Sequence, residues 1–378
     1  MQIRDHADEA VGQQAFTKQL VYLDSLSIQG LRCLERVELS LDSKRNVFIG
    51  DNGAGKTSLL EAIYLLGRGH SFRTANSRRL IQDERDQCVV RAQVQNAHGR
   101  LPVGILKTAD ATRVKLGQDT GIKLSELARA CPVLVLEPGQ HRLVEDGPVL
   151  RRRFLDWSVF HVEHAYHEEW RRFSRALKQR NALLRTAQHA MLPTWTRELV
   201  SAALKVDQFR RQVFQELLPL INHLLTCFLG EDHGLRIQYR SGWLADSSLE
   251  EQYAKQLSQD VERGFTQSGP HRAEIRVSVE RHAARDSLSR GQQKLLITAM
   301  LLGQAQHFAQ RNSISPILLI DDLGSELGQR ARATLYEFLK SYSGQIFVTA
   351  LDAEQIPDEW NKVAKMFHVK HGLIEAMV

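Results

Sequence analysis

The run from Gly50 to Thr57 constrains this chain more than any other feature. It reads Gly-Asp-Asn-Gly-Ala-Gly-Lys-Thr, directly after the apolar segment 47–49, and fits the phosphate-binding pattern G-x-x-x-x-G-K-[ST]. Glycines let successive backbone N–H groups turn toward phosphate oxygens, because a side chain at those turns would clash with the path of the chain. A glycine-rich surface turn would give the same letters by chance. With a strand before it and helical apolar spacing over 58–66, the run predicts a nucleoside triphosphate site.

Two side chains of this loop carry its chemistry. Lys56 supplies a mobile positive charge for the β- and γ-phosphates, and the Thr57 hydroxyl is placed to ligate Mg²⁺. The following helix points the positive end of its dipole at the anion. The predicted nucleotide contacts in the loop are Gly50, Asp51, Asn52, Gly53, Ala54, Gly55, Lys56, Thr57 and Ser58.

A second part of the predicted site lies far downstream, where the apolar run 316–320 ends in Asp321 and Asp322. A central parallel strand delivers such side chains to the carboxyl edge of its sheet. Taken alone, an apolar run with two aspartates is an ordinary core strand leaving a sheet. Together with the loop at Lys56, it predicts Asp321 as a Mg²⁺ ligand and Asp322 as the base that orients water.

A third motif, residues 287–294, reads Ser-Leu-Ser-Arg-Gly-Gln-Gln-Lys and precedes a helical run over 295–302. Ser289, Gly291 and Gln292 at a helix start offer a hydroxyl and backbone N–H groups to an anionic ligand. As local structure this is simply a good N-cap. It also resembles the signature motif of ABC-type ATPases, usually Leu-Ser-Gly-Gly-Gln, with Arg290 in place of the first glycine.

The order of loop, long insertion, signature and Asp-Asp strand resembles the heads of chromosome-maintenance and recombination ATPases, and more narrowly the RecF family. The likeness covers about residues 21 to 355 and is carried further by the stretches 28–32, 69–74, 147–156, 268–272 and 321–327. The resemblance implies an α/β P-loop ABC-type ATPase head, a mixed sheet with helices assembled from both chain ends, plus an inserted, mostly helical lobe.

The chain has 378 residues, which exceeds the size of about 250–300 at which single cores stop growing. We expect an N-terminal extension over 1–20 and the N-terminal half of the ATPase with the P-loop over 21–147. A helical lobe is expected over 148–263. The C-terminal half, with signature, Asp-Asp strand and last core strand, is expected over 264–378.

The resemblance also implies an ATP-dependent homodimer, in which ATP lies between the loop at Lys56 of one copy and Ser289 of the other. It assigns Lys56, Asp322 and Ser289 to catalysis. Further nucleotide contacts would be Arg32, Gln140, Ser289, Gly291, Gln292 and Thr349. Asp322 stands where transporter-type relatives have glutamate, which predicts a slow, DNA-stimulated ATPase that acts as a switch. Gly328 replaces an acid that helps to couple facing subunits, and Cys33 replaces an asparagine.

Basic residues suggest a polyanionic partner, since the formal net charge is +6. The candidate DNA contacts are Arg68, Arg73, Arg152, Arg153, Arg171, Arg172 and Lys178. Two other interpretations stay open, namely internal ion pairs or a solvated helix face for the cluster in 151–185, and phosphate or interface contact for the strip at 68–79. No base-reading motif accompanies them, so the predicted binding ignores sequence.

By resemblance the partner would be single-stranded or gapped DNA, in recombinational repair, replication restart and SOS induction, with RecR and RecO. A transporter-type ATPase, or a scaffold that binds ATP without a DNA role, is the alternative. Four scattered cysteines indicate a reducing, cytoplasmic location. No apolar run approaches the roughly 20 residues that span a bilayer, so no membrane association is expected.

Overall fold

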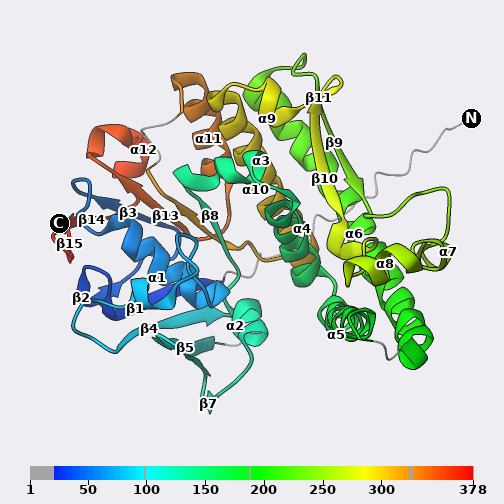
Figure 1. The fold of residues 1–378 in the computed structure, drawn as a ribbon. Coiled ribbons are helices and arrows are strands. Elements are labelled where there is room, and N and C mark those ends of the chain that lie inside the picture. The colour runs from blue at the N-terminus through cyan, green and yellow to red at the C-terminus, as the bar shows by residue number, and fades with distance from the viewer. Residues whose placement is uncertain (1–20, 98, 187–188, 323–326, 378) are drawn as a thin grey trace, which may run out of the picture.

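The computed structural model describes residues 21–97, 99–186, 189–322 and 327–377 (Figure 1). The expected extension over 1–20 lies outside these residues. Among the helices in the described ranges, none combines the length and apolar character needed to cross a membrane.

A six-stranded sheet at the centre of the ATPase lobe joins the two ends of the chain, as predicted. Its order is β15-β14-β3-β13-β12-β8, and β15 alone pairs antiparallel. Strand β3 of the N-terminal half lies between β13 and β14 of the C-terminal half, so neither half can complete the sheet alone. The bounds are β3 (Arg45–Ile49), β8 (Val133–Leu136), β12 (Ile317–Ile320), β13 (Ile346–Ala350), β14 (Lys365–Lys370) and β15 (Leu373–Ala376).

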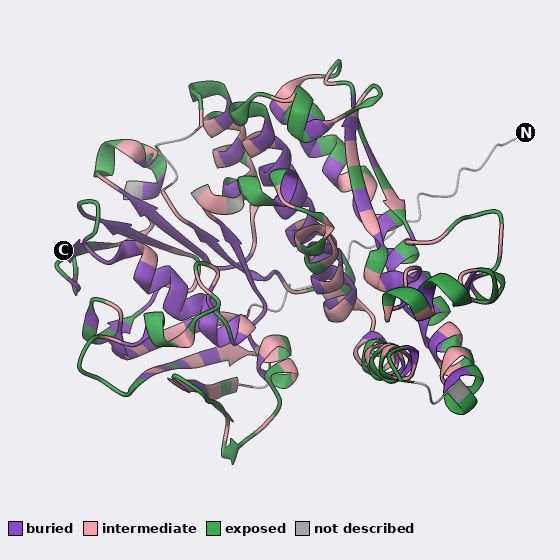
Figure 2. Ribbon diagram, in the orientation of Figure 1, coloured by how far each residue is buried: buried purple, intermediate pink, exposed green. Residues whose placement is uncertain are grey.

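Alternate residues of these strands enter two different hydrophobic cores. In β12, Ile317 and Leu319 belong to one core, whereas Leu318 and Ile320 belong to the other. Both faces are therefore buried, which explains the continuous apolar runs in the sequence. Figure 2 shows the four strands β3, β13, β12 and β8 as almost entirely buried, whereas β15 at the edge is mostly exposed.

The first core lies between the central sheet and a second, antiparallel sheet of order β2-β1-β4-β5-β6-β7. Helix α1 (Lys56–Arg68) fills the space between them and is buried from Ser58 to Gly67. Strand alternation of apolar and polar residues predicted this sheet correctly. Its strands are β1 (Tyr22–Leu31), β2 (Leu34–Ser40), β4 (Gln87–Asn96), β5 (Gly99–Thr108), β6 (Thr112–Leu116) and β7 (Asp119–Thr120), and α2 (Leu124–Ala130) follows them.

The second core lies on the other face and continues into the helical lobe. Helix α10 (Arg290–Asn312) packs on both α4 and α6, so the signature helix connects the sheet to this lobe. The lobe contains α3 (Arg142–Glu145), α4 (Pro148–Val162), α5 (Tyr166–Leu184), α6 (Leu192–Leu229), α7 (Leu249–Lys255) and α8 (Leu257–Arg263). Helices α11 (Gln329–Ser341) and α12 (Asp358–Asn361) complete the ATPase lobe.

A small sheet of order β11-β10-β9 spans the expected boundary at 263/264. Strand β9 (Leu235–Arg240) pairs antiparallel with β10 (Glu274–Val279), which pairs with β11 (His282–Ala283); the short helix α9 (Ala284–Ser287) then leads to the signature. Strands β10 and β11 follow residue 263 in the chain, but they form one sheet with β9 of the helical lobe. The alternation of apolar and polar residues over 273–279 predicted strand β10 but not its pairing with β9.

Candidate functional site

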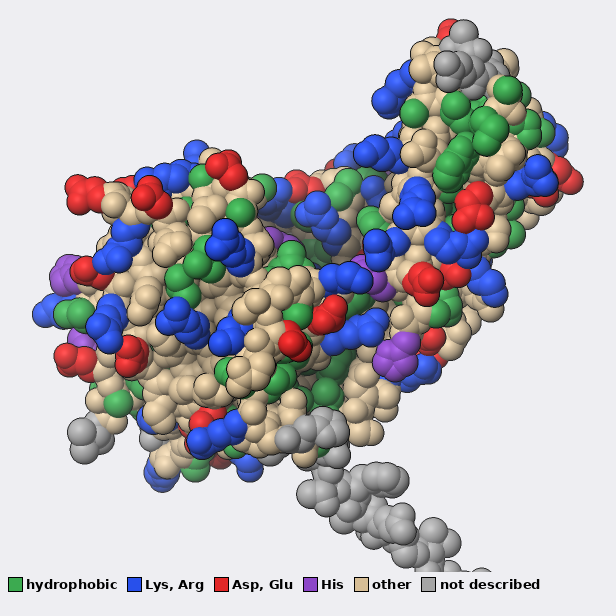
Figure 3. All heavy atoms as spheres, turned by 90° about the horizontal axis from the view of Figure 1, so that it is seen from below, with side chains coloured by type: hydrophobic (Ala, Val, Ile, Leu, Met, Phe, Trp, Pro, Cys, Tyr) green, Lys and Arg blue, Asp and Glu red, His purple; other side chains and the backbone are tan. Residues whose placement is uncertain are grey.

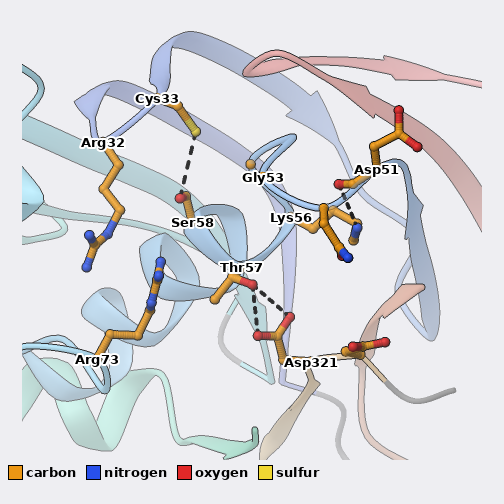
Figure 4. Close-up of a pocket in the computed structure, with 12 residues that line it drawn as sticks. Arg32, Cys33, Asp51, Gly53, Lys56, Thr57, Ser58, Arg73 and Asp321 are labelled. Carbon is orange, nitrogen blue, oxygen red and sulfur yellow. Dashed lines mark hydrogen bonds between the residues drawn. The ribbon is translucent and has the colours of Figure 1, made fainter. Parts of the chain in front are cut away.

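A cavity of about 450 Å³ opens in front of the P-loop, at the carboxyl edge of the parallel sheet (Figure 4). Its size falls within the range of about 300–1,000 Å³ that is typical of small-ligand sites. It is lined by Arg32, Cys33, Asp51, Asn52, Gly53, Gly55, Lys56, Thr57, Ser58, Arg73, Asp321 and Asp322. The structure thus gathers the loop, the Asp-Asp strand and the β1–β2 turn around one space.

The glycines of the loop are required by its path. Gly53 and Gly55 have φ of 80° and 120°, a region that L side chains rarely adopt. A Cβ on Gly50 would lie 2.1 Å from the carbonyl oxygen of Val369 in β14. The backbone of β14 therefore packs directly against the loop at Gly50.

Lys56 is buried with its ammonium turned onto its own loop. Its Nζ donates a hydrogen bond to the carbonyl oxygen of Gly50 and another, of 3.0 Å, to that of Asp51. Burial lowers the pKa of Lys56, and the carboxylates of Asp322 and Asp321 oppose that change. The ammonium therefore lies at the mouth of an anion-binding loop, where a phosphate would compensate its lost hydration.

Thr57 and Asp321 meet although 264 residues separate them. The Thr57 hydroxyl donates to the Asp321 carboxylate at 2.9 Å, and a second hydroxyl, from Thr349, donates to the same carboxylate at 2.8 Å. Desolvation raises the pKa of Asp321 in spite of these two bonds. A hydroxyl and a desolvated carboxylate supply the oxygen ligands that Mg²⁺ prefers, so these residues fit the ion.

Asp322 also lines the pocket, in a left-handed backbone conformation with φ of 52°. Its backbone N–H donates to the Thr349 hydroxyl at 2.8 Å. Thr349 was expected to contact the nucleotide, but its hydroxyl is fully buried behind the two aspartates. The motif continues over 323–326, which lie outside the described residues.

Glu61 is a residue of this site that the sequence motifs did not indicate. It lies on α1, is fully buried, and pairs with Arg32 through two hydrogen bonds, one of 2.9 Å between Nη2 and Oε1. Arg73 approaches the other carboxylate oxygen at 4.0 Å, and the Ser71 hydroxyl donates to Glu61 as well. Within the otherwise apolar stretch 58–66 of this helix, Glu61 is the one charged residue. A single charge in a buried stretch could have indicated a functional role.

Glu137 is a second acidic residue near the site that the sequence motifs did not indicate. It directly follows β8, which pairs with β12 so that Leu136 faces Ile320, and Glu137 therefore lies beside Asp321. Burial raises the pKa of Glu137 to about 7, and the Asp321 charge adds to the effect. Gln140, the expected contact three residues on, lies in the 3₁₀ turn Pro138–His141, and its side chain is not described.

The signature residues lie at a solvent-exposed helix start. Ser289 caps α10 by accepting from the Gln292 N–H, while the Gln292 side chain accepts from the Ser289 N–H. Gly291 has open space around it, since a Cβ there would meet nothing closer than 4.0 Å. None of the three lines the cavity in the described part of the chain.

Four of the seven candidate DNA contacts have intramolecular partners. Arg73 lines the nucleotide cavity, and Arg68 stacks over Tyr64 and Trp157. Arg152 donates to the carbonyl oxygen of Ala273 at 2.9 Å.

The fourth of these, Arg172, pairs with Glu169 and Glu198. Within the 151–185 cluster, Arg172 therefore forms the internal ion pairs of the alternative interpretation, whereas Arg153, Arg171 and Lys178 are exposed.

The fold and the site together define an ABC-type ATPase head. The family model for the RecF/RecN/SMC N-terminal domain matches residues 22–375. Relatives named DNA replication and repair protein RecF, from Aliivibrio salmonicida and Vibrio atlanticus, are 39% and 40% identical; each alignment covers 93% of this chain and 99% of the relative. The chain therefore belongs to the RecF/RecN/SMC N-terminal domain family, and within it to the RecF proteins.

Solved structures share the fold. A structure described as the recombination mediator protein RecF with ATP, in the RecFOR pathway, aligns with a TM-score of 0.86 at 21% identity, covering 97% of this chain and 100% of the other. An Smc head domain from Pyrococcus furiosus aligns with a TM-score of 0.55 at 13% identity, covering 95% and 96%.

Proposed function

We propose that this chain binds ATP and acts in DNA replication and repair, as an ATP-gated homodimeric clamp at single-strand or gapped DNA. The observation that carries the proposal is the meeting of Thr57, in the P-loop, with Asp321, at the end of β12, through a hydrogen bond of 2.9 Å. The names of the curated relatives supply the biological setting.

In this proposal the backbone N–H groups of the loop and the Lys56 ammonium hold the phosphates. Thr57 and Asp321 would hold Mg²⁺, which would supply charge compensation for the phosphates. Arg32 and Arg73 add positive charge on the opposite side of the cavity, beside Ser58. Asp322 orients the attacking water as the proposed base.

The signature requires a second copy in this proposal. Ser289, Gly291 and Gln292 face solvent around an open helix N-terminus, a geometry that suits an anion presented from outside. We infer that each copy offers this helix start to the nucleotide of its partner. Shared phosphates then join the two copies through charge-assisted hydrogen bonds, individually worth roughly 1.5–3 kcal/mol, and hydrolysis removes them.

For DNA the proposal relies on the exposed members of the basic set, Arg153, Arg171 and Lys178. Figure 3 shows Lys and Arg side chains distributed across the junction of the lobes and along the helical lobe on the face seen from below. Such charge binds the backbone without reading bases.

RecR and RecO are proposed partners, in line with the RecFOR pathway that one structural neighbour's description mentions. A cytoplasmic location remains a prediction from the cysteine pattern. The transporter-type alternative is not favoured, since the relatives found are named as DNA replication and repair proteins.

Sedimentation velocity tests the proposal most directly. With Mg²⁺ and ATP the protein should sediment as a dimer, and gapped duplex DNA should join that species at low salt but dissociate at high salt. Lys56→Arg should weaken both nucleotide binding and dimerisation. A protein that remains a monomer at saturating ATP and Mg²⁺ would contradict the clamp.

A further inference from the structure

Thr349 occupies a position from which one hydroxyl reaches both aspartates. It lies in β13, next to β12, and the register pairs Val348 with Ile320, so that Thr349 faces Asp321 in the following step. The hydroxyl donates to Oδ1 of Asp321 at 2.8 Å and accepts from the backbone N–H of Asp322 at 2.8 Å. A threonine hydroxyl has one hydrogen to donate, so that hydrogen is committed to Asp321.

The contact to Asp322 fixes an unfavourable backbone conformation. A φ of 52° places Asp322 in the left-handed region, which L-residues other than glycine, asparagine and aspartate seldom adopt. The N–H of Asp322 is partly buried and is best satisfied by a hydrogen-bond acceptor. Thr349 supplies that acceptor and so stabilises the left-handed conformation of Asp322 after the end of β12.

The contact to Asp321 differs from the one made by Thr57. Thr57 lines the cavity, and its hydroxyl is itself an expected Mg²⁺ ligand, so it would contact the ion directly. The Thr349 hydroxyl is fully buried and belongs to the strand behind the carboxylate. It is therefore available to orient Asp321 whether or not nucleotide is present.

We propose that Thr349 is a positioning residue that presets Asp321 for Mg²⁺ and Asp322 for water. The inference rests on the proposed Mg²⁺-dependent nucleotide binding and adds the residue that tunes it. It replaces the expectation that Thr349 touches the nucleotide. Thr349 also makes β13 part of the proposed metal site, so the position of β13 affects both carboxylates.

The test compares Thr349→Val, which keeps the shape but removes the hydroxyl, with Thr349→Ser, which keeps the hydroxyl. The affinity for a fluorescent ATP analogue is measured with Mg²⁺ and with a chelator. For Thr349→Val we expect the gain from Mg²⁺ to fall about tenfold, the effect of losing one hydrogen bond to a charged group. The affinity without Mg²⁺ should stay at the wild-type value, and Thr349→Ser should restore the gain.

Thr298→Val is the matched control, because Thr298 is a buried threonine of α10 that does not line the cavity. Thermal melts confirm that each variant folds, and Thr349→Ala serves as a second variant without the hydroxyl. If a folded variant without the hydroxyl keeps the wild-type gain in affinity from Mg²⁺, the proposed role of Thr349 is overturned, but the proposed function is not. A wild-type protein without any Mg²⁺-dependent binding overturns the proposed function as well.

Discussion

At the residue scale, the nucleotide cavity has positive charge on one side and negative charge on the other. Arg32 and Arg73 stand beside the buried carboxylate of Glu61, while Asp321 and Asp322 face Lys56 across the loop. Arg32 is held by Glu61 on α1, and Asp321 by hydroxyls of α1 and β13, so these charges are preorganised before a ligand arrives.

Replacing the proposed base tests the role of Asp322. Asp322→Asn removes the charge that orients water but keeps the shape of the side chain, so ATP binding and dimerisation should persist while hydrolysis stops. Steady-state turnover of the wild type should already be below the median enzyme scale of about 10 per second. Rapid wild-type turnover would contradict the idea of a slow switch.

A buried ion pair gives a prediction for stability. Arg180 is fully buried, pairs with Asp260 at 2.8 Å and lies over the ring of Tyr253. Arg180→Ala leaves the Asp260 carboxylate buried without its cation, which should lower the free energy of unfolding by about 3–5 kcal/mol. Arg175→Ala, at an exposed position of the same helix, should change it by less than about 0.5 kcal/mol. Urea unfolding measures both.

At the element scale, α4 is fixed within the helical lobe by ion pairs and also contacts the P-loop helix. Arg151 on α4 pairs with Glu274 of β10 at 2.7 Å, and Asp156 pairs with Arg210 of α6 at 2.8 Å. Trp157 of α4 lies under Arg68, the last residue of the P-loop helix. Helix α4 therefore contacts both the P-loop helix and the rest of the helical lobe.

The same helix makes stability depend on pH. Burial lowers the pKa of His161 to about 3, and Arg68 and Arg129 add to the effect. Between about pH 6.5 and 3 the unfolded chain binds a proton that the folded chain excludes, so the free energy of unfolding falls as the pH falls, by up to about 1.4 kcal/mol per pH unit. His161→Phe should flatten this slope.

Urea unfolding at several pH values, compared between wild type and His161→Phe, isolates this contribution. The comparison matters because other groups titrate in the same range. Glu137, with its pKa raised to about 7, acts in the opposite direction, since its protonated form is favoured in the folded state. Identical slopes in the two proteins would contradict the assignment to His161.

At the scale of the whole molecule, the nucleotide cavity and the signature helix start are separate surfaces of one chain. Gly291→Trp should leave the monomer folded and able to bind ATP, because its position is open. The large ring should block dimerisation, measured by sedimentation with Mg²⁺ and ATP. Gly147→Trp, at another open glycine, is the control and should dimerise normally.

The DNA proposal makes a separate prediction about salt. Alanine at Arg153, Arg171 and Lys178 should weaken binding to gapped DNA and reduce the slope of log affinity against log salt by about 0.9 for each phosphate that is no longer neutralised. Arg172→Ala is the control, because Glu169 and Glu198 already neutralise that side chain. Equal losses of affinity in the control and the test variants would contradict the assignment of the exposed residues.

The sequence by itself determined the parts of the site that depend on local chemistry. The spacing of glycines around Lys56 follows from the path of a phosphate loop, the apolar run before Asp321 follows from a strand buried on both faces, and the Ser289 cap follows from helix geometry. These motifs also indicated an ATPase head built from both chain ends, because an ABC-type order of motifs requires it.

Tertiary structure alone decided which side chains meet. Glu61 is recognisable as a partner of Arg32 and Arg73 once the β1–β2 turn and the loop at 71–73 converge on α1. The basic cluster separated into internal pairs and exposed residues only when helix faces were packed, and Thr349 turned toward Asp321 because β13 lies beside β12. Such pairings depend on distances across the fold, and no local pattern along a chain encodes them.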